Sequence, residues 1–136
     1  MVDYENLKEG MDLPEVKKGP ITRQQLVDYA SASGDYNKLH YDEDFAKKAG
    51  LEGPIAHGML VMAMMGSYIT HWSGKGKLKD FQIRFSGMTK ENDTLTFKGK
   101  IVKKYQENGE NLVEINVESE TQDNNITTHG SAIIVF

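Results

Sequence analysis

The feature that most constrains the fold is the segment at residues 59–72, which contains no Asp, Glu, Lys or Arg. A helix that is apolar around its whole circumference is stable only when other parts of the protein surround it. The uninterrupted apolar run, residues 59–65, is far shorter than the roughly 20 residues that cross a membrane. We therefore expect a buried helix at the centre of the fold, and we expect no membrane span.

The part of the chain after this segment has the pattern of strands. Phe81, Ile83 and Phe85 alternate with polar residues, and this period of two is typical of a strand with one buried face. The expected strands lie at residues 80–85, 94–102, 112–119 and 126–136. The pair Asn108-Gly109 predicts a hairpin turn between the second and third strands. Gly99 predicts a gap or bulge in the second strand.

A buried helix followed by four consecutive antiparallel strands favours one arrangement. A curved sheet that wraps around the helix buries the apolar surface of both. This is the hot-dog arrangement, of the α+β class, and the last strand, which is apolar almost throughout, is expected in the interior of the sheet. The length of 136 residues fits one domain. We therefore expect a single hot-dog domain over residues 1–136.

Two shorter helices are predicted before the buried one. Thr22 and Gln25 form the capping-box pattern, which predicts a helix over residues 23–33 that ends at Gly34. Its expected apolar face consists of Leu26, Val27 and Ala30.

The second short helix is expected between Asp42 and Gly50. Asp42 has the side chain of an N-cap, and Gly50 suits the left-handed position after a helix. Phe45, Ala46 and Ala49 are expected to line its apolar face.

The composition excludes several classes of function. With 16 basic and 20 acidic residues the formal net charge is −4, which argues against nucleic-acid binding by bulk electrostatics. The absence of cysteine excludes disulfides, a thiolate zinc site and a cysteine nucleophile. The first residues, MVDYENLKEGMDL, lack the basic and apolar regions of a signal peptide, so a cytoplasmic protein is expected.

The densest polar stretch is ASGDYNKLH, at residues 32–40 between the two short helices. Asp35 and His40 are five positions apart, and a curled loop would bring this carboxylate and imidazole onto one small molecule as an acid and a base. The alternative is that Asp35 is a turn residue and His40 is a hydrogen-bonded loop histidine. From the residues alone, both interpretations stay open.

The segment YASASGDYNKLHYDEDFAKKAGLEGPIAHGM, residues 29–59, resembles the MaoC-like (R)-specific enoyl-CoA hydratases and (3R)-hydroxyacyl-ACP dehydratases. Within that family it resembles the catalytic subunit of the mycobacterial-type dehydratases. The resemblance implies reversible hydration of trans-2-enoyl thioesters of coenzyme A or acyl carrier protein, which gives (R)-3-hydroxyacyl thioesters. It also implies that Asp35 and His40 are the catalytic pair, that Asn37 orders the loop, and that the Gly58 amide binds the thioester carbonyl.

These roles are chemically consistent. Attack of water on C3 puts negative charge on the carbonyl oxygen, and an amide at a helix N-terminus is a donor aimed at such a charge. Which of Asp35 and His40 is the base is left open. No cofactor is expected. No metal is expected either, because His40, Asp42 and His57 do not have the spacing of a zinc motif.

Two positions depart from the family pattern. Lys38 stands where the family usually has proline, and its expected place is in solvent. Gly66 stands where some CoA-specific members have a small hydroxyl residue. His57, beside Gly58, is interpreted as a packing or supporting residue rather than a proton carrier.

Two other functions compete with the hydro-lyase. A hot-dog acyl-thioesterase would need a carboxylate at or near the central helix, and residues 58–72 contain none. A non-catalytic acyl-binding protein or structural partner subunit would be free to lose the Asp35–His40 pair, which this chain keeps.

The expected assembly is a homodimer, because pairing of sheet edges removes an open edge. A heterodimer with a related hot-dog subunit is the alternative. The expected ligand is an acyl-CoA or acyl-ACP thioester, and the acyl length and the physiological direction stay open.

Overall fold

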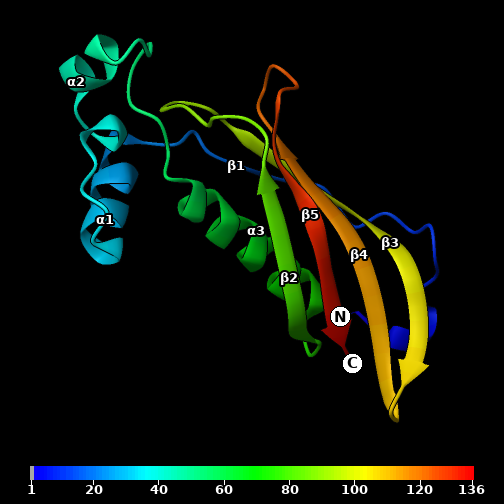
Figure 1. Ribbon diagram of the computed structural model, residues 1–136. Coiled ribbons are helices and arrows are strands. Elements are labelled where there is room, and N and C mark those ends of the chain that lie inside the picture. Colours follow the sequence, from blue (N-terminus) through cyan, green and yellow to red (C-terminus); the bar gives the residue numbers. More distant parts are fainter. Residues whose placement is uncertain (1) are drawn as a thin grey trace.

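The computed structural model describes residues 2–136 and contains one five-stranded antiparallel sheet curved against a central helix, α3 (Figure 1). The strand order is β1-β3-β4-β5-β2. The strands are β1 (Val16–Lys18), β2 (Lys77–Phe85), β3 (Leu95–Glu107), β4 (Glu110–Glu120) and β5 (Ile126–Val135). The helices are α1 (Arg23–Ser33), α2 (Glu43–Lys48) and α3 (Gly58–Ser73), with 3-10 turns η1 (Tyr4–Asn6) and η2 (Lys38–His40). The predicted α+β hot-dog arrangement is confirmed.

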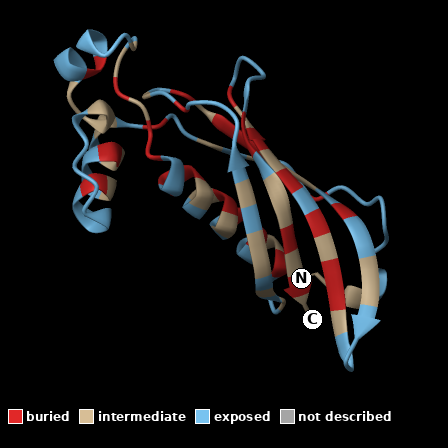
Figure 2. Cartoon of the chain, viewed as in Figure 1, coloured by how far each residue is buried: buried red, intermediate tan, exposed pale blue. Residues whose placement is uncertain are grey.

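The core lies between α3 and the inner face of the sheet (Figure 2). On the helix, Met65 and Ile69 are fully buried, and on the strands so are Phe97, Ile115 and Ile134. Full burial of such a side chain contributes about 1.5–3 kcal/mol. This face fixes the position of α3, and with it the position of the helix N-terminus.

The opposite face of α3 is not covered by any part of residues 2–136. Met59 is 58% exposed, and Ala63, Ser67 and Thr70 are also exposed. The expectation of a helix surrounded by protein is therefore wrong for one copy of the chain. The sheet covers one face of the helix, and the small or weakly polar residues lie on the other.

The four predicted strands are present, but β1 was not predicted, and β3 extends beyond the expected end at residue 102 to Glu107. β5 lies inside the sheet between β4 and β2, and both turn residues of the predicted hairpin have positive φ, 51° at Asn108 and 77° at Gly109. The register between β3 and β4 shifts between Ile101 and Lys103. Gly99 pairs regularly with Val117, so the irregularity does not lie at the glycine.

The short helices α1 and α2 lie beyond the N-terminal end of α3 (Figure 1). Their caps are as predicted: Thr22 Oγ1 accepts from the Gln25 amide at 3.1 Å, and Asp42 Oδ1 accepts from the Phe45 amide at 3.0 Å. The predicted apolar faces were too wide, because Val27 and Phe45 are exposed. Leu26 and Ala30, four positions apart on one line of α1, are the residues that pack inward.

No helix among residues 2–136 has both the length and the apolar character required to cross a membrane.

Candidate active site

The loop between α1 and α2 brings Asp35 and His40 together through short local hydrogen bonds. α1 ends at Gly34, whose φ of 75° turns the chain out of the helix. Asp35 Oδ1 accepts from the Asn37 amide at 3.2 Å, and Asn37 Oδ1 accepts from the Leu39 amide at 3.1 Å. Asn37 thereby caps η2, at the end of which His40 lies. The sequence from 34 to 40 thus encodes a curled loop.

Asp35 Oδ2 and His40 Nε2 face each other at 3.7 Å. This distance is longer than a hydrogen bond, and a shared water or substrate atom fits such a pair. His40 Nδ1 lies 2.9 Å from the carbonyl oxygen of Ile55. Because a carbonyl only accepts, Nδ1 carries the hydrogen, and in the neutral ring Nε2 is left as a base. The Asp35 side chain is 53% exposed, whereas that of His40 is 12% exposed.

A pocket of about 220 Å³ opens between His40 and the start of α3. Gly58 is the first residue of α3 and lines the pocket. A Cβ atom at Gly58 would lie 3.2 Å from the ring of Phe85. The other apolar lining residues are Ile55, Ala56, Val61 and Met88. A helix N-terminus therefore faces a partly apolar pocket that also contains the imidazole.

His57 lies directly behind this pair and is the residue that sequence reasoning undervalued. It is 2% exposed and its ring stacks on His40, with centroids 3.7 Å apart and an angle of 21° between the planes. Its Nε2 lies 3.1 Å from the carbonyl oxygen of Asp35. Burial lowers the pKa of His57; its hydrogen bond to the Asp35 backbone opposes this shift, and the neighbouring His40 adds to it.

Two buried side-chain atoms in the described part of the chain have no hydrogen-bond partner, His57 Nδ1 and Thr89 Oγ1. His57 stacks on His40, and Thr89 lines the pocket. Buried polar atoms are nearly always paired, so an unpaired one often marks a functional site. The only signal in the sequence was that His57 neighbours Gly58.

The residues considered for a metal do not come together as a set. Asp42 caps α2, whereas the donor atoms that lie within 4.8 Å of one another belong to Asp35, His40 and His57. The expectation that no metal is required stays a prediction.

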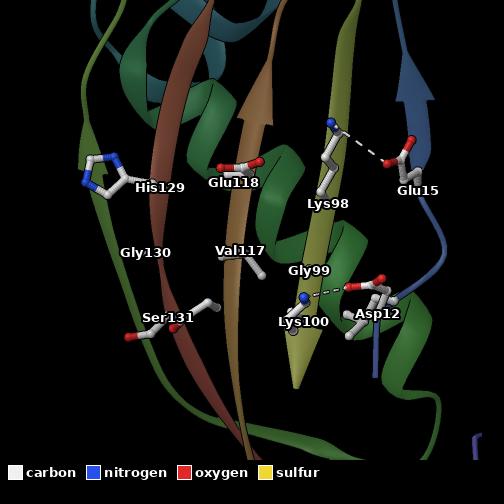
Figure 3. Close-up of a pocket in the computed structure, with 12 residues that line it drawn as sticks. Asp12, Glu15, Lys98, Gly99, Lys100, Val117, Glu118, His129, Gly130 and Ser131 are labelled. Atoms are coloured by element: carbon white, nitrogen blue, oxygen red, sulfur yellow. Dashed lines mark ion pairs between the residues drawn. The ribbon is translucent and has the colours of Figure 1, made fainter. Parts of the chain in front are cut away.

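A larger hollow, about 660 Å³, lies elsewhere, on the face of the sheet turned away from α3 (Figure 3). Both of its lysines are paired: Lys98 Nζ lies 3.9 Å from Glu15, and Lys100 Nζ lies 3.6 Å from Asp12. His129 also lines it, and its Nδ1 lies 3.4 Å from Ser86 Oγ. Volume alone therefore does not identify the reactive site.

Lys38 and Gly66, the two positions that depart from the family pattern, lie outside the Asp35–His40 pair. Lys38 is exposed, as expected. Gly66 lies inside α3, and a Cβ atom there would be 3.4 Å from the Phe81 ring.

Comparison with known proteins was made at the levels of family, sequence and structure. The family model described as "MaoC like domain" matches residues 6–123. The enoyl-CoA hydratase ChsH3 of Mycobacterium tuberculosis is 32% identical over 85% of this chain and 38% of its own length. The mitochondrial 3-hydroxyacyl-[acyl-carrier-protein] dehydratase of Arabidopsis thaliana is 39% identical over 50% of this chain and 40% of its own length. The chain thus spans less than half of the length of these curated relatives.

Solved structures resemble the chain over nearly its whole length. The R-hydratase PhaJ1 of Pseudomonas aeruginosa, in the unliganded form, superposes with a TM-score of 0.87 and 26% identity over 96% of this chain and 83% of that one. A chain of the ChsH1-ChsH2 complex of Mycobacterium tuberculosis superposes with a TM-score of 0.79 and 21% identity, over 94% of this chain and 96% of that one.

Proposed function

Because this chain belongs to the MaoC-like domain family, we propose that it is a hydro-lyase that adds water reversibly to trans-2-enoyl thioesters. The observation that carries the proposal is the Asp35–His40 pair, because His40 lines the same pocket as Gly58, the first residue of α3. The product is the (R)-3-hydroxyacyl thioester. Relatives named as an enoyl-CoA hydratase and as an acyl-carrier-protein dehydratase support either thioester carrier.

His40 is the proton carrier in this proposal. Its Nδ1–H donates to Ile55, so Nε2 is the atom that takes a proton from the attacking water. The Asp35 carboxylate, 3.7 Å from Nε2, binds that water and stabilises the imidazolium that forms. The hydroxide oxygen forms a bond to C3, and the electrons of the C2=C3 double bond move toward C2 and the carbonyl oxygen. The proton on Nε2 then passes to C2, which completes the addition and restores neutral His40.

Gly58 is the proposed donor to the carbonyl oxygen. No hydrogen bond to its amide is found among residues 2–136, and the amide stands at the positive end of α3. A pre-aimed amide stabilises the enolate oxygen more than the ground-state carbonyl, because the charge develops only in the transition state. Asn37 acts indirectly by capping the turn that ends at His40.

Both halves of the described chain contribute to this site. His40 and Gly58 come from the first half of the chain, and Phe85, Thr89 and Thr127 from the second. We therefore propose that residues 1–136 act as one catalytic domain.

The assembly that fits this domain is a homodimer, with a heterodimer as the alternative. A solved neighbour is a chain of a two-component complex, and that likeness concerns the fold alone. The exposed face of α3 and the free edge of β2 are surfaces that a second hot-dog chain would cover.

The test is to incubate the purified protein with crotonyl-CoA and to follow both the enoyl absorbance and the release of free CoA thiol. We expect loss of the enoyl thioester without thiol release, and an (R)-3-hydroxybutyryl product. Thiol release without hydration would replace the proposal with the thioesterase alternative. Failure to hydrate crotonyl-CoA, longer enoyl-CoA thioesters and their acyl-carrier-protein counterparts would contradict it.

A further inference from the structure

His57 joins three parts of the site, although no step of the proposed chemistry uses it. Its ring stacks on His40 and meets Tyr29 edge-on, with centroids 4.8 Å apart. Its own carbonyl accepts the Leu60 amide at 3.1 Å and so begins α3. Its Nε2 reaches the Asp35 carbonyl.

The hydrogen-bond partner fixes which nitrogen of His57 carries the hydrogen. The Asp35 carbonyl oxygen has no hydrogen to give, so His57 Nε2–H is the donor at 3.1 Å. Nδ1 is buried and unpaired within the described residues. If Nδ1 carried a hydrogen as well, the His57 ring would be a cation stacked against His40. The Nδ1–H would then be a buried donor without an acceptor. The ring is therefore the neutral Nε2–H tautomer, which agrees with the lowering of its pKa by burial.

The two ends of the loop are held by different residues: Leu39 and His40 bond to Ile55, whereas the part around Asp35 is held by the hydrogen bond from His57. In the described chain, the other hydrogen bonds of residues 35–37 have partners between residues 33 and 41. Such local bonds shape the loop but do not place it against α3. The bond from His57 spans 22 positions and comes from the residue that precedes Gly58.

We propose that His57 is a positioning residue, whose Nε2–H holds the Asp35 backbone and so places the Asp35 carboxylate opposite His40. This inference rests on the proposed function for its effect on rate. Of the packing and supporting roles expected from the sequence, it selects the supporting one, because it assigns the effect to one hydrogen bond rather than to the volume of the ring. Misplacement of a reacting group by about 1 Å can cost about 100-fold in rate.

Two substitutions separate the hydrogen bond from the packing. His57→Phe keeps a flat ring that stacks on His40 but has no donor. His57→Gln removes the ring but places an amide N–H near the position of Nε2. The matched controls are His129→Phe and His129→Gln, which make the same changes at an exposed histidine on β5.

The rate measurement compares kcat and KM for crotonyl-CoA in these variants. We expect His57→Phe to lower kcat by about 10- to 100-fold with a smaller change in KM, and His57→Gln to recover most of that loss. If packing alone mattered, the order would be reversed, and this result would overturn the proposal.

A second measurement does not depend on activity. Backbone ¹⁵N relaxation should show residues 35–37 as ordered in the parent and in His57→Gln, but mobile on the nanosecond timescale in His57→Phe. Equal order in the Phe variant and the parent would overturn the positioning role. An inactive parent with the expected relaxation pattern would overturn the proposed function and leave the hydrogen-bond role standing, so the two failures are distinguishable.

Discussion

Gly58 meets two demands at the scale of single residues. Its amide is the proposed donor to the thioester, and its missing side chain leaves room for the Phe85 ring, which would lie 3.2 Å from a Cβ atom. We expect Gly58→Ala to lower kcat/KM by about tenfold or more, since the methyl group obstructs approach to the amide. The melting temperature should change little, because the Phe85 side chain is half-exposed and free to move.

Gly53→Ala is the matched control, because a Cβ atom there meets nothing within 4 Å. The double variant Gly58→Ala/Phe85→Leu identifies the cause of the loss. Restored hydration in the double variant would show that displacement of the ring caused the defect, and the role of Gly58 as a thioester donor would be contradicted.

The lowered pKa of His57 has a consequence for stability. Its pKa in the folded protein lies below its ordinary value of 6.5, because burial disfavours the charged ring and His40 stacks against it, while the Asp35 carbonyl and carboxylate partly offset both effects. In the unfolded chain the residue therefore binds its proton at higher pH. Its contribution to the free energy of unfolding is complete above about pH 6.5 and is lost progressively as the pH falls toward the folded pKa.

Denaturant unfolding of the parent and of His57→Phe between pH 8 and pH 5 measures this effect. The parent should lose stability more steeply than the variant below about pH 6.5, and the two should run in parallel above it. Parallel curves over the whole range would show that His57 titrates normally in the folded protein.

Sequence reasoning at this scale succeeded where the partners are neighbours in the chain. Asp35, Asn37 and His40 lie within one loop, so their closeness in the chain allowed them to converge, and the family resemblance assigned them to one site; the local hydrogen bonds show how the loop curls. Phe85 and Thr89 lie tens of residues away from His40 and could not be placed from a local pattern.

At the scale of elements, the unpaired edge of β2 is the feature that favours association with a second chain. It pairs with β5 on one side, and its other edge has no partner strand within residues 2–136. Its length of 9 residues exposes a long row of backbone groups, whereas the opposite edge strand, β1, has 3 residues. Exposed edges of this length are usually covered in native proteins.

We expect a dimer of twice 15.3 kDa in analytical ultracentrifugation at micromolar concentration. Amide hydrogen exchange should show β2 protected nearly as well as the interior strand β4. The short edge strand β1 is the internal control and should exchange faster. A dimer in which β2 exchanges as a free edge would place the interface elsewhere, and a fully active monomer would contradict the assembly.

The positions of the helices and strands could be predicted from the sequence, but which faces of the helices are buried by the rest of the chain could not. Period-two alternation predicted β2, β3 and β4, because one face of each strand packs against the core, and a nearly continuous apolar run predicted β5 in the interior of the sheet. Which side of α3 is covered depends on the strand order β1-β3-β4-β5-β2, which is set by long-range pairing. For the same reason the exposed positions Val27 and Phe45 were assigned to buried faces.

At the scale of the whole molecule, the fold joins a reactive loop to a helix terminus that a sheet holds in place. The loop supplies Asp35 and His40, and α3 supplies the Gly58 amide. The C-terminal end of β2 and the N-terminal end of β5 line the pocket. The family resemblance seen in residues 29–59 extends to a family match over residues 6–123. The sequence could predict this architecture and its chemistry class, but not the volume of the pocket, because that volume depends on packing between the two halves.

The central claim is that Asp35 and His40 act together on an enoyl thioester. The most direct test is the steady-state rate of crotonyl-CoA hydration by the parent, Asp35→Asn and His40→Ala, with Asp28→Asn and His129→Gln as matched controls and circular dichroism as the check of folding. We predict that each site variant loses about 10²- to 10⁴-fold in kcat, while the controls keep the parent rate. A folded Asp35→Asn or His40→Ala variant that hydrates within a few-fold of the parent rate would contradict the account.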